Sequence, residues 1–148
     1  MIIGIGKLHE RGIVHRDLKL ENVMLNSNGY IKIIDFGLAR ILASDEVAMT
    51  HCGTGEYFAP EVLKQCGYDH MVDFWAMGIL IYEMLVGVTP FFSRNKHELL
   101  QNIREKPLKF PAQSKLRTSR DVQDLITRLL DRRPYQRLGH NGGYQEIL

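Results

Sequence analysis

Two short stretches near the start of the chain hold side chains that together suit metal-assisted phosphoryl transfer. The first reads His-Arg-Asp-Leu-Lys-Leu-Glu-Asn at positions 15–22, and the second reads Asp-Phe-Gly at positions 35–37. Phosphoryl transfer needs a group that faces the attacking hydroxyl, oxygen ligands for a metal ion and a cation near the transferred phosphate. The acids, the lysine and the amide of these stretches are groups of those kinds. Each stretch alone is a modest signal, but both in this order and at this distance are a strong one.

The order of the motifs along the chain resembles that of a eukaryotic Ser/Thr protein kinase. After positions 15–22 and 35–37 come Ala-Pro-Glu at 59–61 and Asp-x-x-Pro-x-x-Arg-Leu-Gly at 131–139. The run Thr-His-Cys-Gly-Thr-Gly-Glu-Tyr at 50–57 is similar to the AGC group of these kinases. The resemblance covers almost the whole chain. It implies a mainly α fold with a small β-hairpin element, the large lobe of a kinase.

The resemblance gives individual roles to the side chains of the two stretches. Asp17 would face the substrate hydroxyl, orient it and accept its proton. Lys19 would offset charge on the transferred phosphate of ATP, and a lysine at this position is typical of Ser/Thr rather than Tyr kinases. Asn22 and Asp35 would offer oxygen ligands to Mg²⁺. The alternative for positions 15–22 is a polar surface loop with capping side chains, which the second stretch argues against.

A β-hairpin is expected between the two stretches, where it would hold both metal ligands at adjacent strand ends. Residues 23–25 and 30–34 read as short strands, and Asn-Ser-Asn-Gly at 26–29 is a strong turn signal because Asn-Gly accepts positive φ. By resemblance, Met24 on the first strand would lie under the adenine ring of ATP. The simpler interpretation of Met24 as core filler is compatible with that role.

Residues 38–61 match the activation segment of a kinase. Thr50 then falls on the regulatory phosphosite, where an upstream activating kinase would act, and Arg16 and Arg40 are the expected partners of its phosphate. An ordinary exposed threonine is the alternative.

Substrate contacts are expected on the same side of the lobe. Thr54 would hydrogen-bond near the catalytic acid and lysine and help to discriminate Ser/Thr substrates. Gly55 stands where the AGC group usually has proline, which puts the usual preference for the residue after the phosphoacceptor in doubt. Glu21 and Glu83 match positions that hold upstream arginines of the substrate, so protein substrates with basic residues are expected. A solvated helix face is the alternative for Glu83.

Two further pairs would stabilise the scaffold of the site. Phe36 would pack inward against His15, and Gly37 would let the backbone swing. Glu61, at the end of the activation segment, would form a buried ion pair with Arg137, and loss of either partner would leave an unpaired charge.

The hydrophobic pattern places four helices around these motifs, at residues 1–12, about 68–86, 94–104 and 119–130. The helix that ends near Val86 is apolar nearly all round, which predicts that it is buried. Asp73 near its start would accept hydrogen bonds from the backbone of residues 15–17, although a plain helix cap is the alternative.

Composition excludes several other classes of protein. The net charge is +2, from 19 basic and 17 acidic residues, which argues against a nucleic-acid partner. The two cysteines, Cys52 and Cys66, form neither a disulfide framework nor a zinc pattern, so a reducing, cytoplasmic location is expected. The apolar run at 79–86 is too short to span a membrane.

The 148 residues contain nothing that resembles the small lobe of a kinase. Gly4-x-Gly6 lacks the third glycine of a phosphate loop and reads as a helix start. We therefore expect residues 1–148 to be a partial kinase domain, truncated at both ends, with little activity by itself. In one interpretation the chain is part of a working kinase that uses ATP and Mg²⁺, which the intact catalytic stretches favour. In the other it is an inactive lobe that acts as a protein-binding or competitor module, which the missing small lobe favours.

Overall fold

The computed structural model describes residues 1–43, 46–50, 52–64, 67–111 and 119–148. Most of the regular structure is helical and the strands are short, which confirms the predicted mainly α fold with a small β-hairpin. Within those residues the elements, with η marking a 3-10 helix, are α1 (Ile2–His9), β1 (Ile13–Val14), η1 (Leu20–Asn22), β2 (Val23–Leu25), β3 (Ile31–Ile33), β4 (Arg40–Ile41), η2 (Gly55–Tyr57), α2 (Pro60–Lys64), α3 (Met71–Val86), α4 (Lys96–Glu105), α5 (Arg120–Leu129), η3 (Pro134–Gln136) and η4 (Gly143–Glu146).

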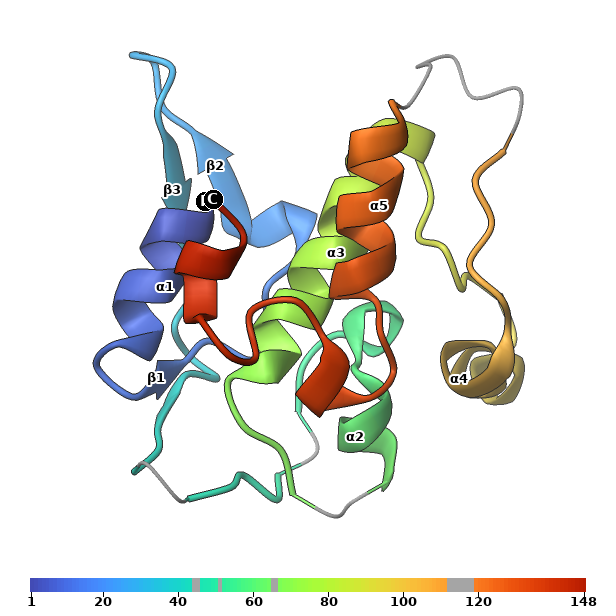
Figure 1. Cartoon of the computed structure of the whole chain (residues 1–148), viewed down its shortest axis with the longest axis horizontal. Helices are drawn as coiled ribbons and strands as arrows, with labels where there is room; N and C mark the ends of the chain where they lie inside the picture. The colour runs from blue at the N-terminus through green and yellow to red at the C-terminus, as the bar shows by residue number, and fades with distance from the viewer. Residues whose placement is uncertain (44–45, 51, 65–66, 112–118) are drawn as a thin grey trace.

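The core is built around α3, which is buried along most of its length, as its apolar pattern predicts. Its fully buried side chains include Phe74, Trp75, Ile79 and Leu80. Only its last turns are more open, where Met84 is exposed. The amphipathic α5 lies beside α3 (Figure 1) and buries Ile126 and Leu129. Ser119 caps α5, because its hydroxyl accepts a hydrogen bond from the Val122 N–H at 3.3 Å.

The short strands form two antiparallel pairs. In the predicted hairpin, β2 and β3 pair with Val23 opposite Ile33, and the hairpin projects from the helical body (Figure 1). Gly29 at its tip has φ +83°, as the Asn-Gly turn requires. The other pair joins β1 to β4. It sets the residues just before position 15 beside the activation segment.

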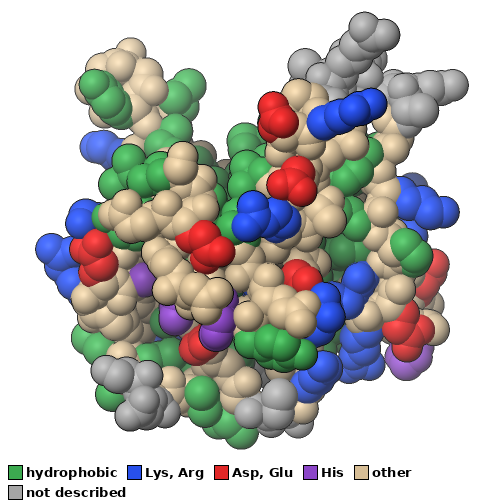
Figure 2. All heavy atoms as spheres, viewed as in Figure 1, with side chains coloured by type: hydrophobic (Ala, Val, Ile, Leu, Met, Phe, Trp, Pro, Cys, Tyr) green, Lys and Arg blue, Asp and Glu red, His purple; other side chains and the backbone are tan. Residues whose placement is uncertain are grey.

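Apolar side chains remain exposed on the hairpin and beside α1. Figure 2 shows hydrophobic side chains on the projecting hairpin, where Met24, Leu25, Tyr30 and Ile31 are exposed. A hollow of about 260 Å³ is lined by Met1, Gly4, Leu8, Ile31, Ile33 and Phe36. Among the helices of the described residues, none has the length and hydropathy needed to cross a membrane.

Replacing Gly6 with alanine should loosen the contact between α1 and η4. A Cβ at position 6 would lie 2.1 Å from Tyr144 Cδ1 and 2.7 Å from its Cβ, so η4 itself would have to shift. We expect the free energy of unfolding, measured by denaturant titration, to fall by about 1–3 kcal/mol. Gly4→Ala on the same helix is the matched control, since its Cβ would meet only Ile33 Cδ1, at 3.7 Å. Equal stability of the two variants would contradict this packing.

Candidate active site

The loop at residues 15–22 is held in place by one buried carboxylate, that of Asp73 in α3. The backbone N–H groups of His15 and Arg16 donate to Asp73 Oδ2 and Oδ1, each at 2.9 Å. His9 Nε2 donates to Oδ2 at 2.8 Å. Asp73 therefore makes the loop contacts expected of it, and it lies within α3 rather than at the cap position, which His70 occupies.

Two residues of the site have backbone conformations that only glycine adopts easily. Arg16 has φ +69° and Asp35 has φ +61°. Such strain costs about 1–3 kcal/mol per residue and persists only where the surroundings impose it. For Arg16, the hydrogen bond from its N–H to Asp73 helps to hold the backbone in this conformation.

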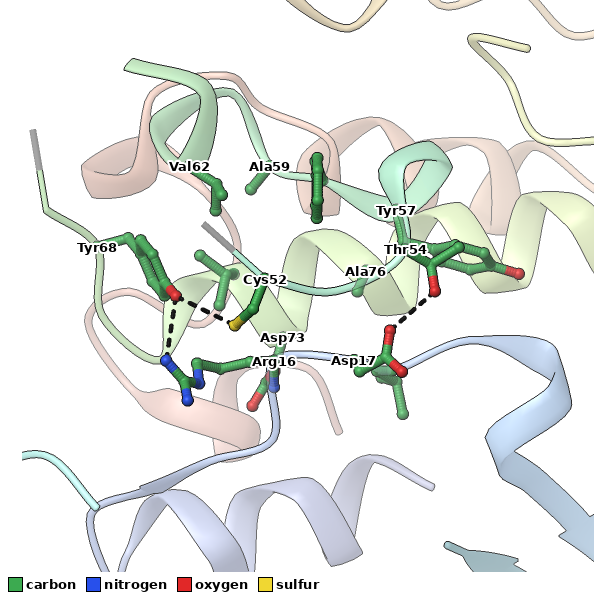
Figure 3. A pocket seen from close by; sticks show the side chains of 13 residues that line it. Arg16, Asp17, Cys52, Thr54, Tyr57, Ala59, Val62, Tyr68, Asp73 and Ala76 are labelled. Atoms are coloured by element: carbon green, nitrogen blue, oxygen red, sulfur yellow. Dashed lines mark hydrogen bonds between the residues drawn. The ribbon is translucent and has the colours of Figure 1, made fainter. Parts of the chain in front are cut away.

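The carboxylate of Asp17 lies between two side chains from different segments, those of Thr54 and Lys19. Thr54 Oγ1 donates to its Oδ1 at 2.9 Å (Figure 3). Lys19 Nζ contacts its Oδ2 at 2.9 Å. Lys19 also donates to Thr54 Oγ1 at 2.9 Å, which closes a triangle of contacts. The structure thus brings together three side chains that the sequence predicts to act together.

The surroundings of Asp17 favour its ionised form. Burial alone raises the pKa of Asp17, but the hydrogen bonds from Lys19 and Thr54 and the charge of Lys19 outweigh it, and the net pKa lies below the ordinary value. The same hydrogen bond to Asp17 raises the pKa of Lys19. The pair is therefore a carboxylate and an ammonium group at neutral pH.

Asn22 and Asp35 lie at adjacent strand ends, as the hairpin prediction requires. The Ile34 N–H donates to the Asn22 carbonyl at 2.9 Å, which continues the β2–β3 ladder by one step and places Asp35 next to it. Asn22 Nδ2 donates to Asp17 O at 2.9 Å, so its Oδ1 is left to accept. Asp35 Oδ1 accepts from the Gly37 N–H at 3.1 Å. These are hard oxygens of the kind that Mg²⁺ binds together with phosphate oxygens, so the donor set fits that ion.

Of the residues that flank the site, His15 is enclosed, whereas Phe36 and Met24 are partly exposed. His15 is fully buried, and the ring of Phe36 contacts it edge to face with centroids 5.0 Å apart. Phe36 is nevertheless 47% exposed, so it does not pack fully inward. Met24 is 52% exposed on β2 and is therefore not core filler in this structure.

The arginines expected at a Thr50 phosphate make other contacts. Arg16 Nε donates to the Leu38 carbonyl at 2.6 Å, and its Nη1 donates to the Tyr68 hydroxyl at 3.3 Å. Arg40 forms an ion pair with Glu46 at 2.6 Å. The side chain of Thr50 is exposed. The phosphosite stays a prediction in this unmodified chain.

On the expected substrate side, hydrogen bonds already engage Glu83. The Tyr57 hydroxyl donates to Glu83 and accepts from the Leu20 N–H at 3.3 Å, so α3 is joined to the catalytic loop through η2. Glu21 is exposed.

Glu56, the residue before Tyr57, also makes a hydrogen bond that was not predicted from the sequence. The buried Thr89 hydroxyl donates to its carboxylate at 2.8 Å. The hydrogen bonds of Tyr57, Tyr68 and His9 were also not predicted, because no local sequence pattern indicates partners that lie far away along the chain.

The end of the activation segment is held by a buried ion pair. Arg137 Nη1 and Nη2 donate to Glu61 at 2.6 and 3.0 Å. The guanidinium also donates to the carbonyls of Met71 and Asp131 and lies 5.2 Å from the centre of the Trp75 ring. These additional contacts satisfy the charge, which a buried pair needs in order to be stable.

Comparison with known proteins gives matches along the whole chain. The model of the family described as "Protein kinase domain" matches residues 1–148. The chain is 43% identical to the serine/threonine-protein kinase sck2 of Schizosaccharomyces pombe over 100% of its own length and 23% of that protein. It is 41% identical to the serine/threonine-protein kinase YPK1 of Saccharomyces cerevisiae (96% of this chain, 20% of that protein). For akt-1 of Caenorhabditis elegans the identity is 43% (100% of this chain, 26% of that protein). The chain thus spans about a quarter or less of these relatives.

Thr54→Val should raise the pKa of Asp17, because it removes a hydrogen bond to the carboxylate while keeping the shape of the side chain. Thr54→Ser, which keeps the hydroxyl, should leave the pKa low. Because the folded-state pKa is below the ordinary value, ionised Asp17 stabilises the fold above that ordinary value, and this stabilisation is lost as pH falls through the folded-state pKa. A carbon-13 NMR titration of the carboxyl measures the shift, and an unchanged curve in Thr54→Val would contradict the assignment.

Asp73→Asn should destabilise the protein by about 3 kcal/mol, since a charged acceptor of backbone N–H groups is replaced by an amide that cannot accept as strongly. Asp124→Asn is the control, because Asp124 is 69% exposed and lies 4.0 Å from its partner Arg128. Thermal unfolding of both variants provides the comparison, and similar losses in the two would mean that Asp73 does not anchor the loop.

Proposed function

The chain belongs to the protein kinase family and is similar to Ser/Thr kinases of the AGC group, and from this membership we propose that it is the substrate-facing lobe of an enzyme that transfers the γ-phosphate of ATP to Ser and Thr hydroxyls of proteins. The observation that carries the proposal is the contact of Asp17 with both Thr54 and Lys19. It joins the activation segment to the loop that would meet the substrate.

Each candidate site residue has a separate role in the proposed reaction. Asp17 orients the substrate hydroxyl and accepts its proton as the oxygen attacks the phosphate. Lys19, already beside that carboxylate, offsets charge on the transferred phosphate. Asn22 and Asp35 hold Mg²⁺, which when bound neutralises charge on the phosphates. The exposed Met24 contacts the adenine ring.

Substrate choice in this proposal depends on acidic side chains near Asp17. Glu21 and Glu83 attract basic residues upstream of the phosphoacceptor. Tyr57 occupies one oxygen of Glu83, which leaves the other for a substrate arginine. Gly55 replaces a proline ring and leaves the residue after the phosphoacceptor less constrained.

Regulation in this proposal depends on an upstream kinase that phosphorylates Thr50. The phosphate then recruits Arg16 and draws Arg40 away from Glu46. The expected compartment is the cytoplasm.

The second candidate function is a binding module without phosphoryl transfer. The exposed apolar side chains of the hairpin and the hollow of about 260 Å³ beside α1 favour it, because such surfaces mark binding sites. A partner protein that covers this surface would bind to this 148-residue chain without the small lobe of a kinase.

A fusion experiment separates the two functions. The part of YPK1 that precedes its matched region is joined to the start of this chain, and phosphate transfer to a Ser-containing peptide with upstream arginines is measured. We expect activity in the fusion, a loss of at least about 100-fold in kcat with Asp17→Asn, and none detectable in the 148 residues alone.

Asp124→Asn, an exposed change far along the chain, is the matched control for the fusion and should leave kcat unchanged. Full activity of the Asp17→Asn fusion would refute the catalytic role. A folded but inactive wild-type fusion would favour the binding module.

A further inference from the structure

The guanidinium of Arg132 holds the C-terminal end of α4, and the proposed reaction gives it no role. It donates to three backbone carbonyls, those of Ile103 at 2.8 Å, Lys106 at 2.5 Å and Asn102 at 3.4 Å. A cation suits this end of a helix, where carbonyls lack the N–H groups of a further turn. Burial lowers the pKa of Arg132, but the ordinary value of an arginine is so high that the group stays charged at neutral pH. Arg132 therefore fastens α4 to the loop that follows α5.

A series of stacked contacts leads from Arg132 to the end of the activation segment. The Arg132 Cζ lies 5.2 Å from the centre of the Phe91 ring. Phe91 is stacked on Trp75, with ring centres 5.8 Å apart and an angle of 16° between the planes. Trp75 contacts the guanidinium of Arg137, which forms the ion pair with Glu61. Both rings are buried, and cation–π contacts are strongest where water is excluded.

The helix that Arg132 holds borders the activation segment on its substrate side. α4 lies to one side of α3 and α5 (Figure 1) and contacts α2, where Arg104 Nη2 donates to the Leu63 carbonyl at 3.4 Å. The buried Leu99 of α4 also bounds the space beside Gly55, since its Cδ2 would lie 3.9 Å from a Cβ at position 55. The placement of α4 therefore affects the residues next to Thr54.

We propose that Arg132 is a positioning residue for substrate binding. It holds α4 beside Gly55, and through the two stacked rings it supports the ion pair at the end of the activation segment. Asp17 is anchored separately, through the hydrogen bonds of the preceding residues to Asp73. Loss of Arg132 should therefore weaken substrate binding and leave the chemical step largely unchanged. The proposal rests on the proposed function, because it names a residue that shapes the substrate-binding surface of that reaction.

The first test measures whether Arg132 acts beyond α4, with Arg132→Met in the 148-residue chain. Amide hydrogen exchange, resolved by NMR, is followed at Lys106 at the end of α4 and at Val62 in α2, whose N–H donates to the Ala59 carbonyl at 3.1 Å. We expect exchange to rise about tenfold at Lys106 and about threefold at Val62. A rise at Lys106 alone would overturn the proposal, since Arg132 would then only cap α4.

Arg128→Met is the matched control, because Arg128 is 55% exposed on α5 and lies 4.0 Å from its partner Asp124. It should change exchange at neither position, and equal effects of the two variants would contradict the role of Arg132. If Arg132→Met fails to fold, Arg132→Lys replaces it. Lysine keeps a cation but lacks the planar fork of donors, so exchange at Lys106 and Val62 should each rise about twofold. No rise at Val62 would again overturn the proposal.

The second test uses the fusion with the preceding part of YPK1 and a Ser-containing peptide with upstream arginines. Arg132→Met should raise KM about tenfold and change kcat less than about twofold, whereas Arg128→Met should change neither. A fall in kcat at unchanged KM would overturn the proposal, since partial unfolding lowers the active fraction without moving KM. If the wild-type fusion transfers no phosphate, the proposed function fails, and exchange at Val62 decides the role of Arg132 by itself.

Discussion

Hydrogen bonds from the backbone of His15 and Arg16 to a single buried carboxylate, that of Asp73, determine the shape of the catalytic loop. Arg16 would not adopt its positive φ in a free loop, because that conformation is costly for a residue with a Cβ. Asp73 belongs to α3, which is buried along most of its length, so the strained loop is attached to the core of the protein. Asp17 follows Arg16 directly, and its position therefore depends on the same carboxylate.

The activation segment is fastened to this anchored loop at several points along its length. Thr54 binds Asp17, and the main chain at Thr50 is joined through Tyr68 to Arg16. At its end, Glu61 is held by the buried guanidinium of Arg137. These contacts use different chemistry, since one is centred on a carboxylate, one on a phenol and one on an ion pair.

The sequence predicted most of the fold because its signals are local. The apolar periodicity of α3, the Ser119 cap of α5 and the Asn-Gly turn each specify an element without knowledge of the rest of the chain. The motif resemblance also placed Asp17, Lys19 and Thr54 near one another. It could not show that Arg40 pairs with Glu46, or that a phenol stands between Arg16 and Thr50. Those contacts depend on how a loop folds back in three dimensions, which spacing along the chain does not encode.

The anchoring of the loop also has a consequence for synthesis of the protein. The contact between His15 and Asp73 joins residues 58 positions apart, and the pair of Glu61 and Arg137 joins residues 76 positions apart. While the chain is still emerging from the ribosome, the catalytic loop has no carboxylate to hold it, and the activation segment has no guanidinium. Long-range contacts of this kind form late and slowly. The nascent chain therefore exposes the catalytic loop until Asp73 has been synthesised, and it exposes the end of the activation segment until Arg137 has been synthesised.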